Sequence, residues 1–177
     1  GILIFLKEVV MITIVENYKR IIKYIERYNI EFSESTCFPK LIAVSKSFQK
    51  EKIQLIIDEG QRIFGENKVQ EALSKWSDLK KENKEIELHL IGPLQSNKVK
   101  DALKVFDVIQ TIDREKIVKK VKQHLGLKKP QIQFFVQVNI GNEPQKNGLK
   151  ISELPDFLDW CSKDMNFPIN GLMCIPP

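Results

Sequence analysis

The sequence predicts an α/β protein in which parallel strands alternate with helices. From Lys40 onward, short apolar runs alternate with longer charged stretches whose apolar residues recur at helical spacing. No low-complexity segment or long linker interrupts this rhythm, and 177 residues suit one domain. Repeated βα units form either an open doubly wound sheet or a closed eight-stranded barrel, and both bind ligands at the carboxyl ends of their strands.

A helix is expected before the first strand, from Ile14 to about Tyr28, and it would cover one end or side of the barrel. Met11 begins this amphipathic segment. We therefore interpret residues 1–10 as an upstream extension and residues 11–177 as a single domain. The apolar positions that recur at helical spacing are Val15, Tyr18, Ile22, Ile25 and Tyr28.

Neither the start of the chain nor its cysteines indicate export. The apolar opening reaches a charge at Lys7, which makes it too short to span a bilayer, and it lacks the features of a signal peptide. Cys37, Cys161 and Cys174 fit neither a disulfide framework nor a zinc pattern. A reducing compartment follows, so we expect a cytoplasmic protein without a membrane anchor.

Six apolar runs are predicted to form the strands of the sheet. The first is rich in branched residues and has the composition of a strand buried on both faces, as in parallel sheets covered by helices. The predicted strands are residues 41–45, 62–65, 88–91, 105–111, 133–139 and 170–175.

The stretches between these runs carry the start, stop and stripe signals of helices. Ser96, Asp113 and Ser152 are the expected caps of the last three helices. Gly60 and Gly126 are expected stops. The stripes expected to face the sheet are Ile53, Ile56 and Ile57; Val69, Ala72, Leu73 and Trp76; Val99, Leu103 and Phe106; Ile117, Val121 and Leu125; and Leu154, Phe157, Leu158 and Cys161.

Lys46 directly follows the first predicted strand and is the principal candidate for chemistry. Because side chains alternate along a strand, it shares a face with Ile42 and Val44. If that face lines a barrel or crevice, partial desolvation favours the neutral amine, a nucleophile that forms a Schiff base with an aldehyde. The alternative is a solvated lysine that simply comes after a strand.

Three other strand ends carry polar groups that would converge with this lysine. They are Asn67, His89 and Asn139, and an imidazole with two amides suits a planar heteroaromatic ligand bearing an aldehyde. Gly65 and Gly92 would allow the backbone to approach such a ring closely. The alternatives are a histidine bonded to backbone and asparagines that only cap the turns after them.

Two loops of the chain carry further polar residues. Residues 93–98 lead into a helix N-terminus, whose free N–H groups would favour an anion or polar ring substituent. Lys146 lies in a long turn, where we expect it in water rather than over the site. Dinucleotide, Walker and serine-elbow motifs are absent, and the net charge of +5 forms no compact stripe, so nucleotide chemistry and nucleic-acid binding are not expected.

Six motifs of the chain stand in a characteristic order and spacing from about Leu41 to Pro177. They are Ala-Val-Ser-Lys at 43–46, Phe-Gly-Glu-Asn at 64–67 with Gln-Glu at 70–71, His-Leu-Ile-Gly-Pro-Leu-Gln-Ser-Asn-Lys at 89–98, Thr-Ile-Asp at 111–113, Gln-Val-Asn-Ile at 137–140 and Gly-Leu-Met at 171–173. Together they resemble the pyridoxal 5′-phosphate (PLP) homeostasis proteins, the YggS/PROSC family. The block at 89–98 is far more specific than any single lysine.

The resemblance implies a TIM (β/α)8-type barrel of PLP fold type III, similar to the N-terminal barrel of alanine racemase. In it Lys46 would hold PLP as a Schiff base, and Lys146 falls on a lysine typical of its loop. The implied function is non-catalytic: buffering or delivery of PLP inside the cell, as a monomer, with PLP-dependent apoenzymes as partners. By matching position, the residues that would line or border the pocket are Asn67, His89, Ser96, Asn97, Asn139 and Met173.

The sequence departs from this family in one respect that matters physically. A barrel needs eight strands, but the sequence supplies six before it stops at Pro177, so we expect a barrel truncated after the sixth strand. The part not supplied is where the family places its phosphate-binding stretches and the arginine that faces the pyridine nitrogen. An unclosed sheet would leave edges at its first and sixth strands.

Two other classes of function stay open. A PLP-dependent enzyme of the alanine-racemase type would need a base on the opposite face of the bound ring, usually a tyrosine. Tyr18, Tyr24 and Tyr28 all lie in the first predicted helix, which argues against it. The third class is an interaction or scaffold domain that has lost its ligand.

Overall fold

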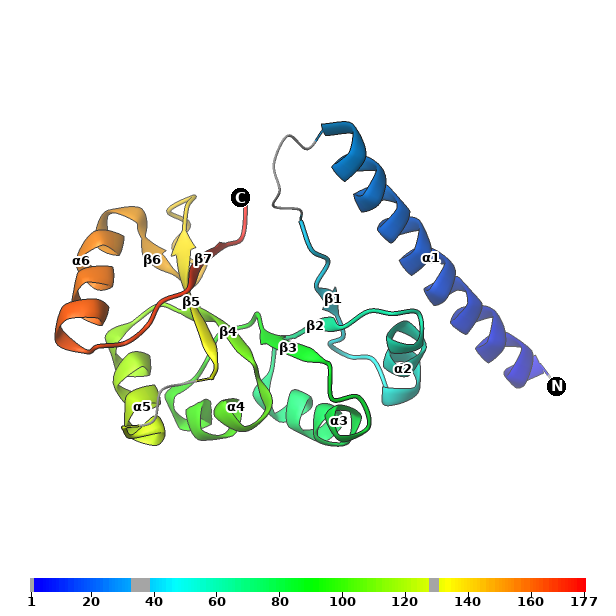
Figure 1. Ribbon diagram of the computed structural model, residues 1–177, viewed down its shortest axis with the longest axis horizontal. Coiled ribbons are helices and arrows are strands. Elements are labelled where there is room, and N and C mark those ends of the chain that lie inside the picture. Colours follow the sequence, from blue (N-terminus) through cyan, green and yellow to red (C-terminus); the bar gives the residue numbers. More distant parts are fainter. Residues whose placement is uncertain (1, 33–38, 128–130) are drawn as a thin grey trace.

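The computed structural model describes residues 2–32, 39–127 and 131–177, so Cys37 lies outside the described residues. It holds one parallel sheet with helices along one side, which confirms the predicted α/β class (Figure 1). The elements are α1 (Ile2–Phe32), β1 (Ala43–Val44), α2 (Lys50–Asp58), β2 (Ile63–Glu66), α3 (Val69–Glu82), β3 (Glu87–Leu90), η1 (Ser96–Lys98), α4 (Val99–Val105), β4 (Val108–Ile112), α5 (Glu115–Leu125), β5 (Gln133–Asn139), β6 (Leu149–Lys150), η2 (Ile151–Glu153), α6 (Leu154–Asp159), η3 (Trp160–Asp164) and β7 (Gly171–Cys174).

Strands β1 to β5 stand in the sheet in the order in which the chain forms them, and β7 lies on the other edge of β5 from β4. β1 to β5 pair successively, and every pair is parallel. β4 and β7 both pair with Val136, so they lie on opposite edges of β5. β6 and β7 both pair with Val138, so β6 lies on the same edge of β5 as β4. In the described residues, β1 and β7 are each paired along one edge only, as expected for an unclosed barrel.

The predicted strands lie where the structure has strands, but some of their first or last residues differ. β5 matches its predicted range, whereas β1 is reduced to two residues. β4 begins at Val108 rather than Val105, because Val105 completes α4 and the Phe106 N–H still bonds to the Ala102 carbonyl at 3.0 Å. The two-residue strand β6 was not predicted, since it is too short to show an alternating pattern.

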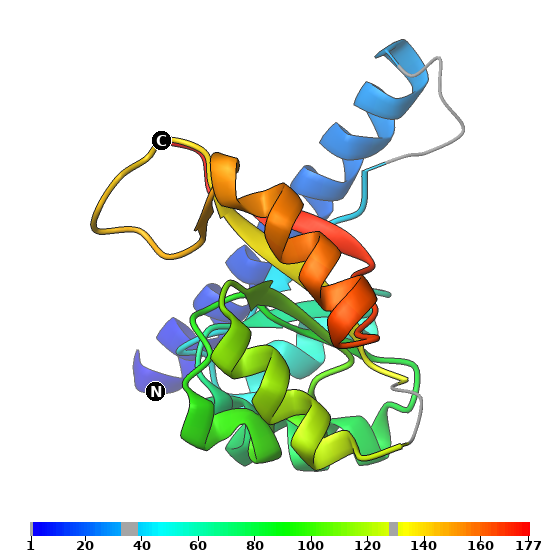
Figure 2. The same cartoon turned by 90° about the vertical axis from the view of Figure 1, so that its left-hand side faces the viewer.

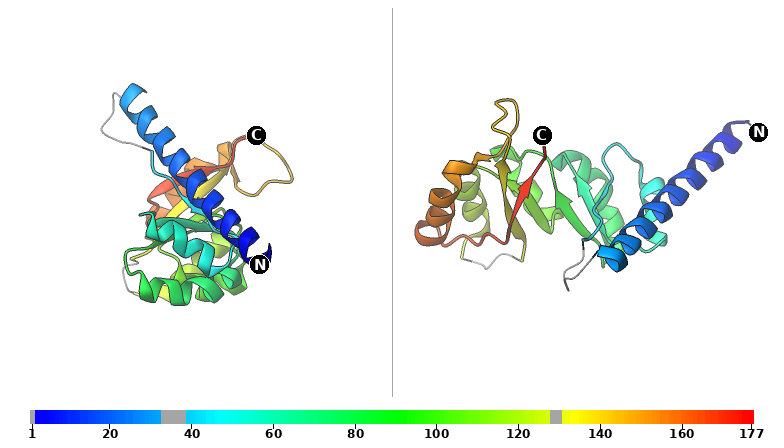
Figure 3. Two further views of the ribbon diagram at one scale, coloured as in Figure 1. Left: turned by 90° about the vertical axis from the view of Figure 1, so that its right-hand side faces the viewer. Right: turned by 90° about the horizontal axis from the view of Figure 1, so that it is seen from above.

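Helix α1 is longer than predicted. It runs without a break from Ile2 to Phe32 and packs against α2, so it covers a side of the sheet, one of the two places expected for it (Figure 3). Its contacts include a hydrogen bond from the Tyr18 hydroxyl to Gln61 Oε1, at 3.1 Å. The helix continues through Met11, and the division into residues 1–10 and 11–177 stays a prediction. In the described part of the chain, no helix has the length and apolarity needed to cross a membrane.

The predicted helix caps are wrong, although the stops are right. Ser96 and Ser152 lie inside the 3-10 turns η1 and η2 that precede α4 and α6, and neither makes a side-chain cap bond. The Asp113 carboxylate pairs with Arg114 at 2.7 Å and accepts the Gly148 N–H at 3.3 Å. The chain does turn at Gly60 and Gly126, whose φ angles are 104° and 60°.

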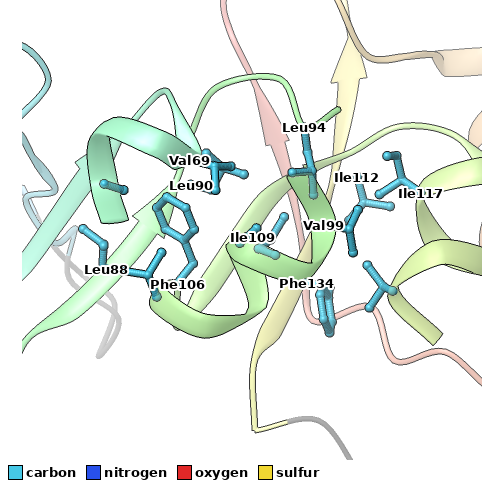
Figure 4. Packing of buried hydrophobic residues seen from close by; sticks show 14 of the residues in the cluster. Val69, Leu88, Leu90, Leu94, Val99, Phe106, Ile109, Ile112, Ile117 and Phe134 are labelled. Atoms are coloured by element: carbon cyan, nitrogen blue, oxygen red, sulfur yellow. The ribbon is translucent and has the colours of Figure 1, made fainter. Parts of the chain in front are cut away.

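The hydrophobic core lies between the sheet and the arc of helices on its outer side (Figures 1 and 2). Trp76 of α3 is fully buried, and its ring centroid lies 4.9 Å from that of Phe64 on β2. Figure 4 shows the next section of this core, where Val99 of α4 faces Ile109 and Phe134. The other face of the sheet, called here the inner face, carries no helices from the described part of the chain.

Two glycines on neighbouring strands provide a test of this packing. A Cβ added at Gly92 would lie 2.2 Å from the Asn67 carbonyl oxygen, whereas one at Gly65 would meet only the side-chain ends of Ile91 and Ile42, at 3.0 and 3.1 Å. Because backbone cannot give way as a methyl group can, we expect Gly92→Ala to lower the free energy of unfolding by about 3 kcal/mol and Gly65→Ala by about 1 kcal/mol. Urea unfolding measures both; equal losses would contradict this packing.

Candidate functional site

The register of the strands aligns one row of residues across the inner face. Val44, Gly65, His89 and Val108 are successive partners from β1 to β4. Paired residues of parallel strands point to the same side of a sheet. Because Phe64, one residue before Gly65, packs against Trp76 among the helices, this row faces the opposite, inner side.

The floor of this face is apolar and tightly filled at its centre. Gly65 was expected to make room for a ligand ring, but methyl groups of Ile91 and Ile42 lie over it. Gly92 was expected to do the same, and it accommodates the backbone of Asn67 instead. The expectation that these glycines touch a ring is therefore corrected: they allow strand ends to pack closely.

Lys46 follows β1 by two residues, in a turn at the carboxyl end of the strand, and is exposed. The partial desolvation that we expected for its amine is absent, because the inner face has no second layer in the described residues. Val44 on that face is likewise 45% exposed. The structure thus presents an accessible primary amine at the edge where ligands of parallel sheets bind.

The turn that carries Lys46 is held by the buried Lys75 of α3. The Lys75 Nζ donates to the Ser45 carbonyl at 2.7 Å and pairs with Glu71 Oε1 at 2.9 Å. The same Glu71 oxygen accepts the backbone N–H of Ser47. The residues on both sides of Lys46 are therefore fixed, directly or through Glu71, by one ammonium group.

The ammonium group of Lys75 is held in turn by the buried carboxylate of Glu66. Glu66, the last residue of β2, is fully buried; its Oε1 accepts the Ser45 hydroxyl at 2.8 Å and Trp76 Nε1 at 3.0 Å, and it lies 2.7 Å from Lys75 Nζ. Its second oxygen, Oε2, has no hydrogen-bond partner. Burying a pair of charges costs free energy. The pair nevertheless gives the turn hydrogen bonds that apolar side chains could not make.

His89 is buried on the inner face and oriented by two side chains. Its Nδ1 accepts the Gln110 amide at 2.8 Å, and its Nε2 lies 2.7 Å from Glu87 Oε1. With Nδ1 accepting, the remaining ring proton sits on Nε2 and is donated to Glu87. The ring is thus fixed by side chains, and not by backbone as in the alternative considered for it.

The two candidate asparagines differ in what their amides do. Asn139 donates to the Glu143 carbonyl at 2.8 Å and accepts the Glu143 N–H at 3.2 Å, which is the turn-capping role considered as its alternative. Asn67 Oδ1 is buried and has no partner. A buried acceptor without a donor is unfavourable, and this one lies at the end of the strand next to β1.

The remaining candidates lie around the same edge but make no close polar cluster. Ser96 and Asn97 are in η1, half-buried and exposed respectively, and Met173 is half-buried on β7 beside Gln137. Lys146 is not free in water as expected: it pairs with Glu143 at 2.8 Å and donates to the Pro176 carbonyl at 3.1 Å.

Sequence reasoning missed the residues that orient the site, namely Glu66, Lys75 and Gln110. One signal was present for Lys75, because it falls on the same helical stripe as Ala72 and Leu79, where only buried residues are expected. Glu66 lies two residues after the buried Phe64 on the same strand, so alternation places both side chains on the same face of the sheet. Nothing in the sequence alone pairs Gln110 with His89.

The comparisons with known proteins agree with this fold. The family model described as "Alanine racemase, N-terminal domain" matches residues 27–177. The chain is 35% identical to the pyridoxal phosphate homeostasis protein of Vibrio cholerae, over 94% of this chain and 71% of that protein. It is 39% identical to that of Pasteurella multocida, over 77% of this chain and 59% of that protein, so it spans little more than half of the latter's length.

Solved structures show the same architecture. PipY of Synechococcus elongatus with PLP bound is 29% identical and superposes with a TM-score of 0.69, covering 86% of this chain and 68% of PipY. The form without PLP gives 0.71 at 35% identity, covering 78% and 64%. Alanine racemase from E. faecalis is 13% identical with a TM-score of 0.62 over 93% of this chain and 42% of that chain, a likeness of fold alone.

The turn that carries Lys46 makes the stability of the protein depend on pH in the acid range. The hydrogen bond from Lys75, followed by that from the Ser47 N–H, holds the pKa of Glu71 below its usual 4.5. The unfolded chain therefore takes up this proton first, so the stability that Glu71 contributes is complete above about pH 4.5 and is lost as pH falls through its lowered folded pKa. We expect thermal melting between pH 5 and pH 3 to show a shallower decline for Glu71→Gln than for the wild type; parallel declines would contradict this.

Proposed function

Because the chain belongs to the alanine racemase N-terminal domain family, and within it to the pyridoxal phosphate homeostasis proteins, we propose that it binds PLP without turning over a substrate. The observation that carries the proposal is Lys46, an exposed amine on a fixed turn at the carboxyl end of β1. Two PLP homeostasis relatives and a PLP-bound PipY support the choice of ligand.

The residues present fit the ring and aldehyde of PLP. Lys46 supplies the amine, and the partnerless buried oxygen of Asn67 offers an acceptor at the next strand end. β1 and β3 lie two strand spacings apart, about 10 Å, across a floor of isoleucine side chains. His89 borders that floor with its ring fixed, while Ser96, Asn97, Asn139 and Met173 lie around the rim as candidate contacts.

Lys46 would bond covalently to the aldehyde carbon, in the Schiff-base role proposed for it. PLP, when bound, supplies an electrophilic aldehyde that a primary amine can hold and later release. A neutral Lys46 Nζ adds to that carbon, and one water leaves as the C=N bond forms. Addition of water reverses the bond, which suits a protein that buffers the cofactor or delivers it to PLP-dependent apoenzymes.

The tyrosines support a non-catalytic role. A racemase of this fold needs a second base on the far side of the bound ring. Tyr18 donates to Gln61, and Gln61 also donates to the Leu41 and Ile63 carbonyls, at the amino end of the sheet and far from Lys46. Tyr24 and Tyr28 lie further along the same helix.

The proposal extends to the setting of the protein. We propose a monomer in the cytoplasm. Among the described residues Cys161 is a buried free thiol and Cys174 an exposed one, as is usual for proteins of a reducing compartment. Burial raises the pKa of Cys161 to about 11, so this thiol is inert near neutral pH.

Borohydride reduction of the chain mixed with PLP tests the covalent site. We expect a single adduct at Lys46 in the peptide map, because Lys46 follows β1 at the carboxyl edge of the sheet, where the proposal places PLP. Lys46→Met should lose the adduct, whereas Lys50→Met, a matched change on the nearby surface of α2, should keep it. Labelling scattered over several lysines, or unchanged in Lys46→Met, would contradict the proposal.

Optical rotation of L-alanine tests the absence of turnover. With PLP and the chain present, we expect rotation to be lost no faster than with PLP alone, since no tyrosine stands near Lys46 among the described residues. Faster loss that disappears in Lys46→Met would mean an enzyme of the racemase type.

A further inference from the structure

We propose that Lys75 is the positioning residue for Lys46: it holds the turn at residues 45–48 in the one backbone conformation from which Lys46 reacts with PLP. This inference rests on the proposed function and adds a residue to it. Lys75 lies on α3, across the outer side of the sheet, so it acts through the turn and not on the cofactor.

The contacts of Lys75 fall on both sides of Lys46 and leave Lys46 itself free. Its Nζ donates to the Ser45 carbonyl at 2.7 Å and pairs with Glu71, which accepts the Ser47 N–H. The third contact, at 2.7 Å, is to Glu66. One ammonium group thus connects the end of β1, the end of β2 and, through Glu71, the residue after Lys46.

The backbone of this turn needs such support. Ser47 has a φ angle of 64°, in the left-handed region that a serine seldom adopts. The turn itself is closed by one backbone bond, from the Phe48 N–H to the Ser45 carbonyl at 3.2 Å. Because Lys75 and Glu71 bond to the residues on either side of Lys46, they favour this strained conformation over relaxed alternatives.

The chemistry explains why a charged residue is used here. Lys75 is 8% exposed and Glu66 is fully buried, an arrangement that an apolar pair would replace at no loss of stability. An apolar pair, however, would offer no donor to the Ser45 carbonyl and no partner to Glu71. The buried charges therefore fix the geometry of the turn and add little to the stability of the protein.

Fixed geometry matters for the step assigned to Lys46. Its amine must approach the aldehyde carbon along a narrow range of directions before water can leave, and misplacement by about 1 Å can slow such a step on the order of a hundredfold. Lys46 has a long flexible side chain, so the direction of its Cα–Cβ bond, set by the turn, limits which positions its amine samples.

The same helix offers a matched control. Lys80 of α3 also bonds to one backbone carbonyl, that of Val105 at 3.1 Å, and to one carboxylate, Asp107 at 2.6 Å. It connects α3 to the start of β4, away from Lys46. Lys80→Met therefore removes a similar set of bonds, with one carboxylate partner fewer, without touching the turn.

The experiment measures how fast the absorbance of the PLP adduct forms, as a function of pH, in the wild type, Lys75→Met and Lys80→Met. We expect Lys75→Met to form the Lys46 adduct about tenfold more slowly or worse and with an altered pH profile, and Lys80→Met to follow the wild type. Because Lys75→Met leaves Glu66 unpaired, the double variant Glu66→Gln/Lys75→Met is measured beside it, and melting temperatures report folding for all four.

The outcomes separate this inference from the proposed function. No adduct at Lys46 in the wild type would overturn the proposed function and, with it, the inference. A wild-type adduct with unchanged rate and pH profile in a folded Lys75→Met, or in the folded double variant, would overturn the inference alone. Equal slowing in Lys75→Met and Lys80→Met would also overturn it, because the effect would then be general loss of stability.

Discussion

The structure of the candidate site depends on one buried ion pair, between Glu66 and Lys75. Glu66 ends β2 and Lys75 comes from α3, so the pair connects the sheet to a helix at the edge where the site lies. Around it, Ser45 and Trp76 bond to the same carboxylate oxygen. A buried pair adds little net stability, but either member without the other leaves an uncompensated charge. The turn at Lys46 is thereby tied to correct packing of β1, β2 and α3.

The two faces of the sheet have different tasks. The outer face is covered by helices and holds the core, where Phe64, Leu88 and Ile109 are buried. The inner face carries Val44, Gly65 and His89 in one row and is open at β1. Alternation along each strand assigns successive residues to packing and to the site. This is why Ser45 and Lys46, adjacent in sequence, have such different surroundings.

Residue patterns were enough to predict the fold and the position of Lys46, but they did not reveal which residues hold the turn around Lys46 in place. Apolar runs located β5 to the residue, and helical stripes located α2 and α3, since burial of a whole run or stripe is visible along the chain. The end of α4 at Val105 depends on a local bond that spacing does not reveal. Lys75 and Gln110 act through partners 30 and 21 residues away, and such pairings arise only from the packing of separate elements.

The central claim is that PLP binds on the inner face through Lys46. A crystal structure of the chain grown with PLP tests it most directly. We expect continuous density from Lys46 Nζ to the aldehyde carbon, with the ring over the isoleucine floor and a new partner for Asn67 Oδ1. Density joined to another lysine, or a ring bound on the helix side of the sheet, would contradict it.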